Sequence, residues 1–324
     1  MNVLVTGGAG YVGSHAVLAL LEAGHDVTVL DDLSSGHPEA VRDVPLAVAD
    51  VTDRGALERL VRERGPFDAV MHFAGKIQVG ESVRKPDLYF HVNVVGTLHL
   101  LELLARHGTR WFVFSSSAAV YGEPETVPIP EEHPLRPASP YGETKRAVEA
   151  MLPWWEEAYG LRWVSLRYFN AAGADPRGRT GERHDPETHL IPVVLQVALG
   201  RRDAVEVYGT DWPTADGTCV RDFVHVSDLA TAHRLALEHL GNGGASGCFN
   251  LGGGQGWSVR QVIEVCRQVT GRPIPVREAP RRPGDPAVLV ADPARARRQL
   301  RWQPQFSSLE TIVRTAWDWH KAGY

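Results

Sequence analysis

The sequence predicts an α/β fold in which a doubly wound, mainly parallel sheet is followed by a smaller α/β lobe. Three observations predict this class. Short apolar runs alternate with longer amphipathic stretches through the first half of the chain. These runs are apolar at nearly every position, which is typical of strands that helices cover on both faces. A glycine-rich turn follows the first run and precedes the first amphipathic stretch, where a parallel α/β sheet passes from strand to helix.

The predicted elements alternate along the chain. The strand candidates are apolar and mostly rich in valine, and they comprise residues 3–5, 27–30, 48–51, 69–73, 111–115 and 163–167. The helix candidates have apolar residues at helical spacing, and they comprise residues 14–23, 54–64, 94–107 and 145–159. Strand–helix–strand units cross over with a single hand, so the strands are expected to be parallel.

The pattern changes near residue 170, where glycine, proline and charged residues become frequent. We therefore expect a Rossmann-type dinucleotide-binding domain over residues 1–170 and a second, mainly substrate-binding lobe over 171–324. Two apolar segments, 223–226 and 249–251, are expected to return to the first domain. Because no repeat or low-complexity linker separates the parts, the two lobes are expected to pack together with a cleft between them.

Charge and hydropathy exclude two classes of partner. The net charge of −5 comes without a basic tail, which argues against a nucleic-acid partner. The N-terminus has no basic leader followed by an apolar stretch, and no apolar run approaches the roughly 18 residues of a membrane span. The sequence therefore predicts a cytoplasmic protein without a membrane segment.

Cysteine and histidine usage indicates neither disulfides nor a metal. The three cysteines are odd in number and far apart, so neither a disulfide framework nor a zinc ribbon is expected. The 14 histidines are scattered, with no H-E-x-x-H and no obvious paired ligands. No metal site is predicted, and a metal hydrolase is disfavoured.

The turn after the first strand has the spacing of a dinucleotide-binding loop. Gly7, Gly10 and Gly13 stand three residues apart and enclose Tyr11 and Val12. Glycines at this spacing allow a tight turn and let the backbone approach a pyrophosphate. The following helix then points its free N–H groups and positive dipole end at the phosphates.

An acidic residue stands where such a site needs one. Asp31 ends the second strand, roughly 20 residues beyond the loop, where a carboxylate accepts hydrogen bonds from the adenosine ribose. Asp32 adds negative charge and no arginine stands beside the pair, so NAD is favoured over NADP. Further NAD contacts are expected mainly at strand ends and their loops: Leu33, Ser34, Ser35, Gly36, Asp50, Val51, Phe73, Ala74, Gly75, Asn93, Ser115, Tyr168 and Phe169.

A tyrosine and a lysine one helical turn apart form the predicted catalytic pair. Tyr141 and Lys145 would share one helix face. A free tyrosine has a pKa near 10, and a nearby lysine cation together with a positive nicotinamide ring would favour the phenolate. Ser117, at the end of a strand, is expected to hydrogen-bond the same substrate oxygen and relay the proton.

Motifs in both halves resemble the extended short-chain dehydrogenase/reductases and, among these, the UDP-glucose 4-epimerases. The matching stretches cover nearly the whole chain, and those of the second lobe are the most specific. They are residues 5–15, 72–75, 79–82, 115–117, 141–145, 166–170, 216–218, 220–226, 250–252 and 282–285.

The resemblance implies a mechanism and a set of substrate contacts. NAD stays bound, Tyr141 takes the proton of the sugar 4-hydroxyl, and a transient 4-keto sugar turns over before the hydride returns. The substrate UDP-hexose would be held in the second lobe. Asn170 and Arg221 would bind the diphosphate, Arg282 and Asp285 the phosphate and ribose, and Tyr208 the uracil. The other expected contacts are Ser117, Tyr141, His189, Leu190, Glu206 and Leu289.

Three positions bear on specificity. Lys76 stands one residue earlier than the lysine found in some members of the family, which leaves its cofactor contact open. His189 replaces a common asparagine, so a contact there would be through the backbone. Leu289 takes the position of a gate beside the sugar 2-substituent, and its small size predicts some activity on UDP-N-acetylhexosamines.

Two alternative functions use the same fold. A sugar-nucleotide 4,6-dehydratase or decarboxylase shares the tyrosine and lysine, but its family places acidic residues where this chain has Ala118 and Ala119. A non-catalytic NAD sensor would not need Ser117, Tyr141 and Lys145 together. The helices predicted at 94–107 and 145–159 have apolar faces that could form a four-helix bundle across a two-fold axis or could pack within the core of one chain. The resemblance implies a homodimer.

Overall fold

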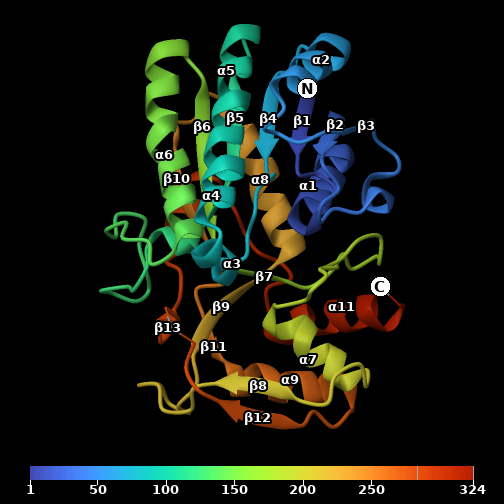
Figure 1. Cartoon of the computed structure of the whole chain (residues 1–324), viewed down its shortest axis with the longest axis vertical. Helices are drawn as coiled ribbons and strands as arrows, with labels where there is room; N and C mark the ends of the chain where they lie inside the picture. The colour runs from blue at the N-terminus through green and yellow to red at the C-terminus, as the bar shows by residue number, and fades with distance from the viewer. Residues whose placement is uncertain (283, 324) are drawn as a thin grey trace.

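A computed structural model describes residues 1–282 and 284–323. Its larger part is a seven-stranded sheet in the order β10-β6-β5-β4-β1-β2-β3 (Figure 1). Every strand pair in this sheet is parallel, which confirms the predicted fold class. The strands are β1 (Asn2–Thr6), β2 (Asp26–Asp31), β3 (Leu46–Val48), β4 (Ala69–His72), β5 (Trp111–Ser117), β6 (Arg162–Tyr168) and β10 (Gly247–Leu251).

Helices cover both faces of this sheet. On one face lie α1 (Tyr11–Glu22) and α8 (Val226–Gly241), and on the other α2 (Arg54–Arg64), α5 (Thr97–His107) and α6 (Pro140–Tyr159). Successive side chains of a strand point to opposite faces, so Val3 and Val5 join the core under α1 while Leu4 joins the core under α2. Shorter pieces complete this part: η1 (Pro38–Val41), α3 (Val79–Arg84), α4 (Pro86–Tyr89), η2 (Phe90–Gly96) and η3 (Ala118–Val120).

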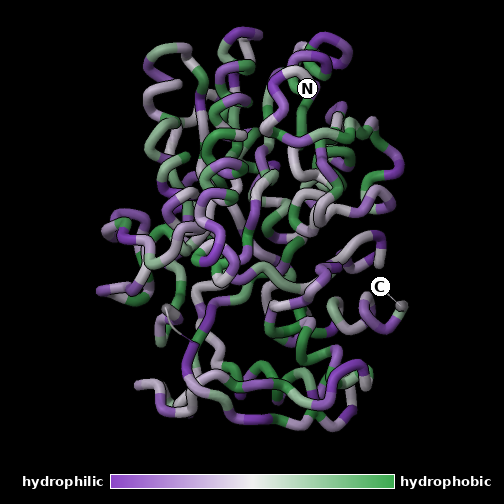
Figure 2. The backbone as a smooth tube through the Cα atoms, in the orientation of Figure 1, coloured by the Kyte–Doolittle hydropathy of each residue, from purple (hydrophilic) through white to green (hydrophobic). Residues whose placement is uncertain are grey.

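The second lobe contains two small sheets packed with three longer helices. One sheet joins β7 (Asn170–Ala172), β9 (Val220–His225), β11 (Gly256–Ser258) and β13 (Val288–Leu289). The other pairs β8 (Val205–Tyr208) with β12 (Val276–Ala279). The helices are α7 (Leu190–Ala198), α9 (Val259–Thr270) and α11 (Leu309–Lys321), and a short α10 (Ala294–Gln299) packs on β10. Hydrophobic residues concentrate along the strands and the inner helix faces (Figure 2).

The lobes are interleaved along the chain. Of the two segments expected to return to the first domain, 249–251 lies in β10, the edge strand of the large sheet. Residues 223–225 instead lie in β9 of the smaller sheet, and only Val226 enters α8, which packs on α1. Strand β9 is apolar because it is buried between β7 and its other partners, β11 and β13. The sequence alone does not distinguish such a strand from a strand of the large sheet.

Element bounds differ from expectation at three places. The third strand is β3, two residues earlier than the predicted 48–51, because the chain turns where Asp50 Oδ1 accepts the backbone N–H of Thr52 at 2.8 Å. The helix predicted at 94–107 begins at Pro86 and passes through the π-helical η2. Helix α6 begins at Pro140, because Ser139 caps it by accepting the N–H of Gly142 at 3.2 Å.

No apolar run of membrane-spanning length was predicted, but Pro86–His107 forms one continuous helical segment. By length and composition it could cross a membrane, and 44% of its most apolar window is buried inside the protein. Its residues Leu100, Leu101 and Leu104 are buried in the core beneath the large sheet. Core helices of soluble proteins satisfy the same criterion, so this finding is weak evidence for a membrane span.

A buried ion pair joins α6 to the large sheet. Glu149 on α6 accepts three hydrogen bonds from the guanidinium of Arg167 on β6, the shortest of them 2.6 Å, and both side chains are at most 5% exposed. Ser165 Oγ donates to the same carboxylate at 2.7 Å. Arg167 also donates to Tyr121 Oη, which in turn donates to Asn250 Oδ1 of β10 at 2.7 Å. The network thus connects α6, β6 and the edge strand.

A buried histidine gives the first testable expectation. His72 on β4 lies between Thr6 Oγ1, at 2.6 Å, and Thr97 Oγ1, at 2.7 Å. Because Thr97 Oγ1 donates to Asn93 O, it accepts from His72 Nε2, and Nδ1 accepts from Thr6. Burial, with a smaller effect of the Lys145 charge, lowers the pKa of His72 to about 3. The neutral ring is therefore part of the folded core.

We expect this histidine to make the protein acid-sensitive. An imidazole whose folded pKa is depressed stabilises the fold fully above pH 6.5, and this contribution is lost as the pH falls toward 3. Between pH 6 and pH 4, the unfolding free energy of the wild type should fall more steeply than that of His72→Gln. The difference should be about 1.4 kcal/mol per pH unit, measured by urea denaturation. The exposed His107→Gln should keep the wild-type slope; equal slopes in all three proteins would contradict this role of His72.

Candidate functional site

The glycine loop lies at the carboxyl end of β1, against the turn that follows β4. Gly7 has φ +70, and a Cβ on it would lie 2.5 Å from Ala74 N. A Cβ on Gly13 would lie 2.1 Å from Gly7 O, so only glycine fits at this crossing of loop and helix. Helix α1 begins at Tyr11 without a side-chain cap, so its first N–H groups can serve an anionic ligand at the loop.

Asp31 lies at the end of β2 beside this loop. Its carboxylate accepts the N–H of Ala9 and the N–H of Leu33, each at 2.9 Å, and its side chain is buried. Burial raises the pKa of Asp31, and the two backbone hydrogen bonds partly offset this. No lysine or arginine in the described part of the chain forms an ion pair with it. The carboxylate therefore ties the second strand to the glycine loop and keeps lone pairs for a ligand hydroxyl.

The other predicted cofactor residues lie in the loops after β2, β3 and β4. After β2 the chain passes Asp32 and turns at Leu33, which has φ +58. The loop then continues through Ser34, Ser35 and Gly36. Phe73 N and Ala74 N both donate to Thr6 O, which holds the Phe73–Gly75 turn against the first strand. Val51 is buried next to Gly96, whereas Asp50 is engaged with its own turn. The Lys76 ammonium donates to Ser34 Oγ at 3.2 Å and so links two of these loops.

Asn93 acts on the site through another segment. Its Oδ1 accepts the N–H of Lys76 at 2.8 Å, and its amide donates to Lys76 O and to Thr144 Oγ1, each at 3.0 Å. All of these partners belong to the protein, and Asn93 is buried. Asn93 is therefore placed to position the turn after β4 relative to α6.

Tyr141 and Lys145 lie one turn apart at the start of α6, next to the end of β5. Tyr141 hydrogen-bonds the Ser117 hydroxyl. Lys145 Nζ lies 5.9 Å from the centre of the Tyr141 ring and donates to Ser115 O at 2.8 Å. Its side chain is almost completely buried, and the hydrogen bond to the end of β5 holds the ammonium near the tyrosine ring. The structure thus brings Ser117, Tyr141 and Lys145 together.

The electrostatics of this trio differ from the simplest expectation. Burial raises the pKa of Tyr141, and the hydrogen bond with Ser117 offsets only part of that rise. Burial also lowers the pKa of Lys145 to about 8, although the Glu149 charge acts in the opposite direction. The side chains alone therefore do not favour a phenolate. A further positive charge at the site would be needed to lower the pKa of Tyr141.

Two aromatic residues border the trio. Tyr168 Oη and Ser115 Oγ are hydrogen-bonded at 2.5 Å across β5 and β6. Phe169 packs with Leu289 against a small core around Ala118 and Val120. Leu289, expected as the gate, therefore packs against the small core that contains η3. Helix η3 begins directly after Ser117.

A cluster of polar residues lies on the second lobe. Arg282 donates to Asp285 at 3.0 Å, and its guanidinium lies 4.7 Å from the centre of the Tyr208 ring. Arg221 lies 3.9 Å from the other oxygen of Asp285, and Tyr208 donates to Glu206. The structure thus brings five predicted substrate contacts together. Pro283, inside the same motif, lies outside the described residues.

Strand β9 connects this cluster to the trio. In its parallel pairings, Arg221 is the partner of Leu289 on β13 and Phe223 is the partner of Asn170 on β7. Tyr168 at the end of β6 is the strand partner of Ser117, and Asn170 follows two residues later. The phosphate-binding candidates therefore begin close to the trio. A molecule contacting both Ser117 on β5 and Arg221 on β9 would span the two lobes.

His189 and Leu190 form the start of α7. The N–H of His189 donates to Glu187 Oε1 at 2.8 Å, and its carbonyl accepts the N–H of Val193 at 3.0 Å. The N–H of His189 is therefore already engaged, whereas its carbonyl keeps a second lone pair for the predicted substrate contact. The His189 ring instead joins Glu182, His184 and Glu187, whose candidate ligand atoms all lie within 4.8 Å of one another.

This group was not predicted from the sequence, from which no metal site was expected. The four residues lie within eight consecutive positions at the spacing E-x-H-x-x-E-x-H. This spacing differs from the helical H-E-x-x-H pattern. The spacing itself was the available signal, because an irregular loop can turn alternate side chains toward one point. The prediction that the histidines are merely scattered is wrong for this pair.

The loop, Asp31 and the trio fit a dinucleotide. The backbone of Ala74 and of Gly7 takes the space that a Cβ on Gly7 or Gly13 would need, so this tight loop requires glycine. The uncapped start of α1 beside it can accept a pyrophosphate. Asp31 suits a ribose hydroxyl and would repel a 2′-phosphate. The positive charge that Tyr141 lacks would come from an oxidised nicotinamide.

Comparison with known proteins agrees with this fit. The model of the NAD dependent epimerase/dehydratase family matches residues 3–252. The chain is 56% identical over 321 residues to the UDP-glucose 4-epimerase of Halalkalibacterium halodurans, covering 99% of this chain and 96% of that protein. It is 52% identical over 318 residues to the UDP-glucose 4-epimerase of Corynebacterium glutamicum, covering 98% and 95% respectively.

Solved structures give the same result. UDP-glucose 4-epimerase from Brucella ovis in complex with NAD superposes with a TM-score of 0.95 at 48% identity, covering 98% of this chain and 97% of that one. UDP-glucose 4-epimerase from Bifidobacterium longum in complex with NAD⁺ and UDP gives a TM-score of 0.94 at 38% identity, covering 100% and 99%.

Proposed function

This chain belongs to the NAD dependent epimerase/dehydratase family, and we propose that within it the protein is an NAD-dependent UDP-glucose 4-epimerase. It is an isomerase that interconverts UDP-glucose and UDP-galactose by inverting carbon 4. The observation that carries this proposal is the grouping of Ser117, Tyr141 and Lys145 at the strand end next to the glycine loop. The relatives at 47–56% identity over nearly their whole length support the same reaction.

The cofactor is NAD, and the loops after β1, β2, β3 and β4 would hold it. When bound, NAD supplies an acceptor for the C4 hydride and returns the same hydride. Asp31 would bind the adenosine ribose, and the N–H groups at the start of α1 would bind the pyrophosphate. Asn93 keeps the turn at Phe73–Gly75 in place for this purpose.

Tyr141 is the proposed base and acid of the reaction. It takes the proton from the sugar 4-hydroxyl in one direction and returns it in the other. A single group can therefore act as base and then as acid in this reversible step. Ser117 hydrogen-bonds Tyr141 and is placed to bind the same sugar oxygen. Lys145, fixed by Ser115 O, would add its positive charge to that of an oxidised nicotinamide, and the two together would favour the phenolate.

The second lobe would hold UDP while the sugar turns. Arg221 and Arg282 suit the diphosphate because a guanidinium is always charged and binds oxyanions in a bidentate manner. Asp285 already orients both arginines, and Tyr208 offers a ring face to the uracil. Asn170, Leu190, Glu206 and Leu289 complete the proposed contacts. These groups lie on β7, β8, β9 and β13, at the start of α7 and in the segment between β12 and β13. Because all of them belong to the second lobe, the UDP can stay fixed while only the hexose rotates.

Elimination chemistry lacks a suitable group in this site. A 4,6-dehydratase needs an acid and a base beyond the tyrosine, and the positions after Ser117 hold Ala118 and Ala119. Neither alanine can transfer a proton. Epimerisation needs no further acid or base, since one oxygen is deprotonated and later reprotonated.

Product analysis tests the function directly. The purified protein, with no NAD added, is incubated separately with UDP-galactose and dTDP-glucose, and the products are identified by NMR. We expect UDP-glucose from UDP-galactose and no reaction of dTDP-glucose. A 4-keto-6-deoxy sugar would indicate the dehydratase, and retained NAD without turnover would indicate a sensor. Either result would overturn the proposal.

A substitution at Leu289 should change sugar selectivity. We propose that leucine leaves room for an N-acetyl group, so the wild type should epimerise UDP-GalNAc as well as UDP-galactose. Leu289→Tyr should lower the ratio of kcat/KM for UDP-GalNAc to that for UDP-galactose by about tenfold or more, because a bulky ring fills the space. Leu289→Ile, which keeps the volume, should leave the ratio unchanged. No activity of the wild type on UDP-GalNAc would contradict the gate.

We also propose that the protein is a cytoplasmic homodimer. Helices α5 and α6 lie side by side on one face of the molecule (Figure 1). Trp154 on α6 is 67% exposed and Phe90, at the start of η2, is also exposed, so this face carries apolar surface that a second copy could cover. The three cysteines are free, which suits a reducing compartment.

A further inference from the structure

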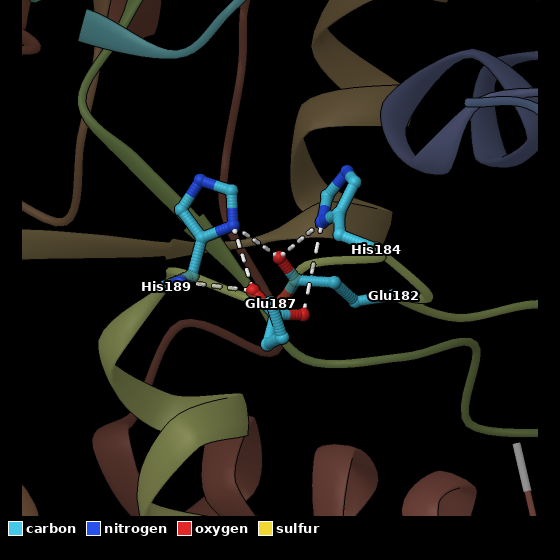
Figure 3. A group of neighbouring side chains, drawn as sticks. All are labelled: Glu182, His184, Glu187 and His189. Carbon is cyan, nitrogen blue, oxygen red and sulfur yellow. Dashed lines mark hydrogen bonds and ion pairs between the residues drawn. The ribbon is translucent and has the colours of Figure 1, made fainter. Parts of the chain in front are cut away.

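Two carboxylates and two imidazoles meet in the segment between β7 and α7, outside the proposed catalytic trio. Figure 3 shows His184 and His189 turned toward Glu182 and Glu187, which lie between the two rings. His189 Nδ1 lies 2.7 Å from Glu182 Oε1 and 3.4 Å from Glu187 Oε1. His184 Nδ1 lies 3.2 Å from Glu182 Oε1 and 3.8 Å from Glu187 Oε2. Both rings thus present the same nitrogen to one point.

The charges of this cluster are unusual. Glu182 and Glu187 are each at most 6% exposed, and their candidate ligand oxygens lie within 4.8 Å of each other. In the described part of the chain, no lysine or arginine side chain pairs with either carboxylate; their ion pairs are with His184 and His189. Two neighbouring buried negative charges require compensation at short range.

The geometry provides a place for that compensation. The candidate ligand atoms of both imidazoles and both carboxylates lie within 4.8 Å of one another. One divalent cation at the point that they face would balance the two buried carboxylates.

The donor atoms select a class of cation. Two imidazole nitrogens and two carboxylate oxygens suit zinc and its neighbours in the first transition row, whereas calcium and magnesium prefer all-oxygen sites. Four protein ligands would complete a tetrahedral zinc site and leave no open position for a substrate. We propose that Glu182, His184, Glu187 and His189 bind one divalent transition-metal ion, for which zinc is the best fit.

The surroundings assign this site a structural role. The Tyr11 ring, in the glycine loop, meets the His184 ring edge-on with centres 6.2 Å apart, and Tyr11 Oη donates to Gly173 O at 2.6 Å. On the other side, Glu187 Oε1 accepts the N–H groups of Thr188 and His189 at the start of α7. A metal ion here would fasten the 173–189 segment between the glycine loop and the second lobe.

The test measures metal binding by the whole protein after removal of any histidine tag. Protein treated with a chelator and then dialysed is titrated with zinc chloride alone, and bound metal is measured by elemental analysis. We expect about one zinc per chain in the wild type and less than about 0.1 in the double variant His184→Gln/His189→Gln. His107→Gln, an exposed histidine outside the cluster, should bind zinc as the wild type does.

A second measurement needs no variant and remains decisive if the double variant fails to fold. Saturating zinc should raise the thermal unfolding midpoint of the chelator-treated wild type by about 5 °C, since the ion binds the folded state. Magnesium at the same concentration should not. Wild-type protein that takes up less than about 0.1 zinc per chain and shows no shift would overturn the proposal, as would equal zinc binding by the double variant.

Discussion

Replacing Tyr141 by phenylalanine should abolish epimerisation and leave NAD in place. The phenol is the group that transfers the proton, and loss of general acid–base catalysis costs about 10²- to 10⁴-fold in kcat. The ring itself remains, so the packing at the start of α6 and the position of Lys145 should be preserved. Turnover of UDP-galactose and the NAD released on denaturation are measured on the same sample.

The matched control is Tyr159→Phe, at the far end of the same helix. Tyr159 is 63% exposed and lies a full helix length from Ser117, so kcat should stay at the wild-type value. Full activity of Tyr141→Phe would remove the tyrosine from the mechanism. Loss of both activity and NAD would show instead that the phenol supports the cofactor site.

Replacing Glu149 by alanine should lower the free energy of unfolding more than the other substitutions proposed here. Glu149→Ala leaves the Arg167 guanidinium buried with no carboxylate partner, and an uncompensated buried charge costs about 3–5 kcal/mol. It also removes the acceptor of Ser165 Oγ. The unfolding free energy is measured by urea denaturation at pH 7. A loss below about 1 kcal/mol would mean that water or a neighbouring group replaces the carboxylate.

Two companion variants separate the charge from the contact. Glu310→Ala removes a carboxylate that is paired with Arg314 on the surface of α11, and this should cost at most about 0.5 kcal/mol. In Glu149→Met/Arg167→Met, both charges are replaced by apolar side chains, so stability should recover partly relative to Glu149→Ala. Recovery would be incomplete because Arg167 also donates to Tyr121 and to Glu131 O.

The parts of the fold that could be predicted are those encoded within a few neighbouring residues. The glycine loop, Asp31 and the Tyr141–Lys145 spacing are local patterns, and each lies where the strand ends meet. Alternation of apolar runs with amphipathic stretches was sufficient for six strands of the large sheet, because both faces are covered and the runs stand out.

The features that could not be predicted depend on contacts between distant segments. The partners of β9 are β7, β11 and β13, and nothing in its own residues says which sheet it joins. The pKa of Tyr141 was expected to fall through Lys145, yet desolvation by the surrounding protein raises it, and that desolvation is a property of the assembled fold. The Glu182–His189 cluster follows no helical spacing, so only the path of its loop shows that the four side chains converge.

The position of β10 and α8 in the first lobe has a consequence for how the chain is made. A ribosome that has reached residue 170 has produced six of the seven strands, but not the edge strand or the helix that covers α1. Leu229, Phe249 and Leu251 belong to the same core as Val3 and Val5, so this core closes only after much of the second lobe has left the exit tunnel. The two lobes should therefore mature together during translation, and a gene cut after codon 170 should not yield an independently folding half.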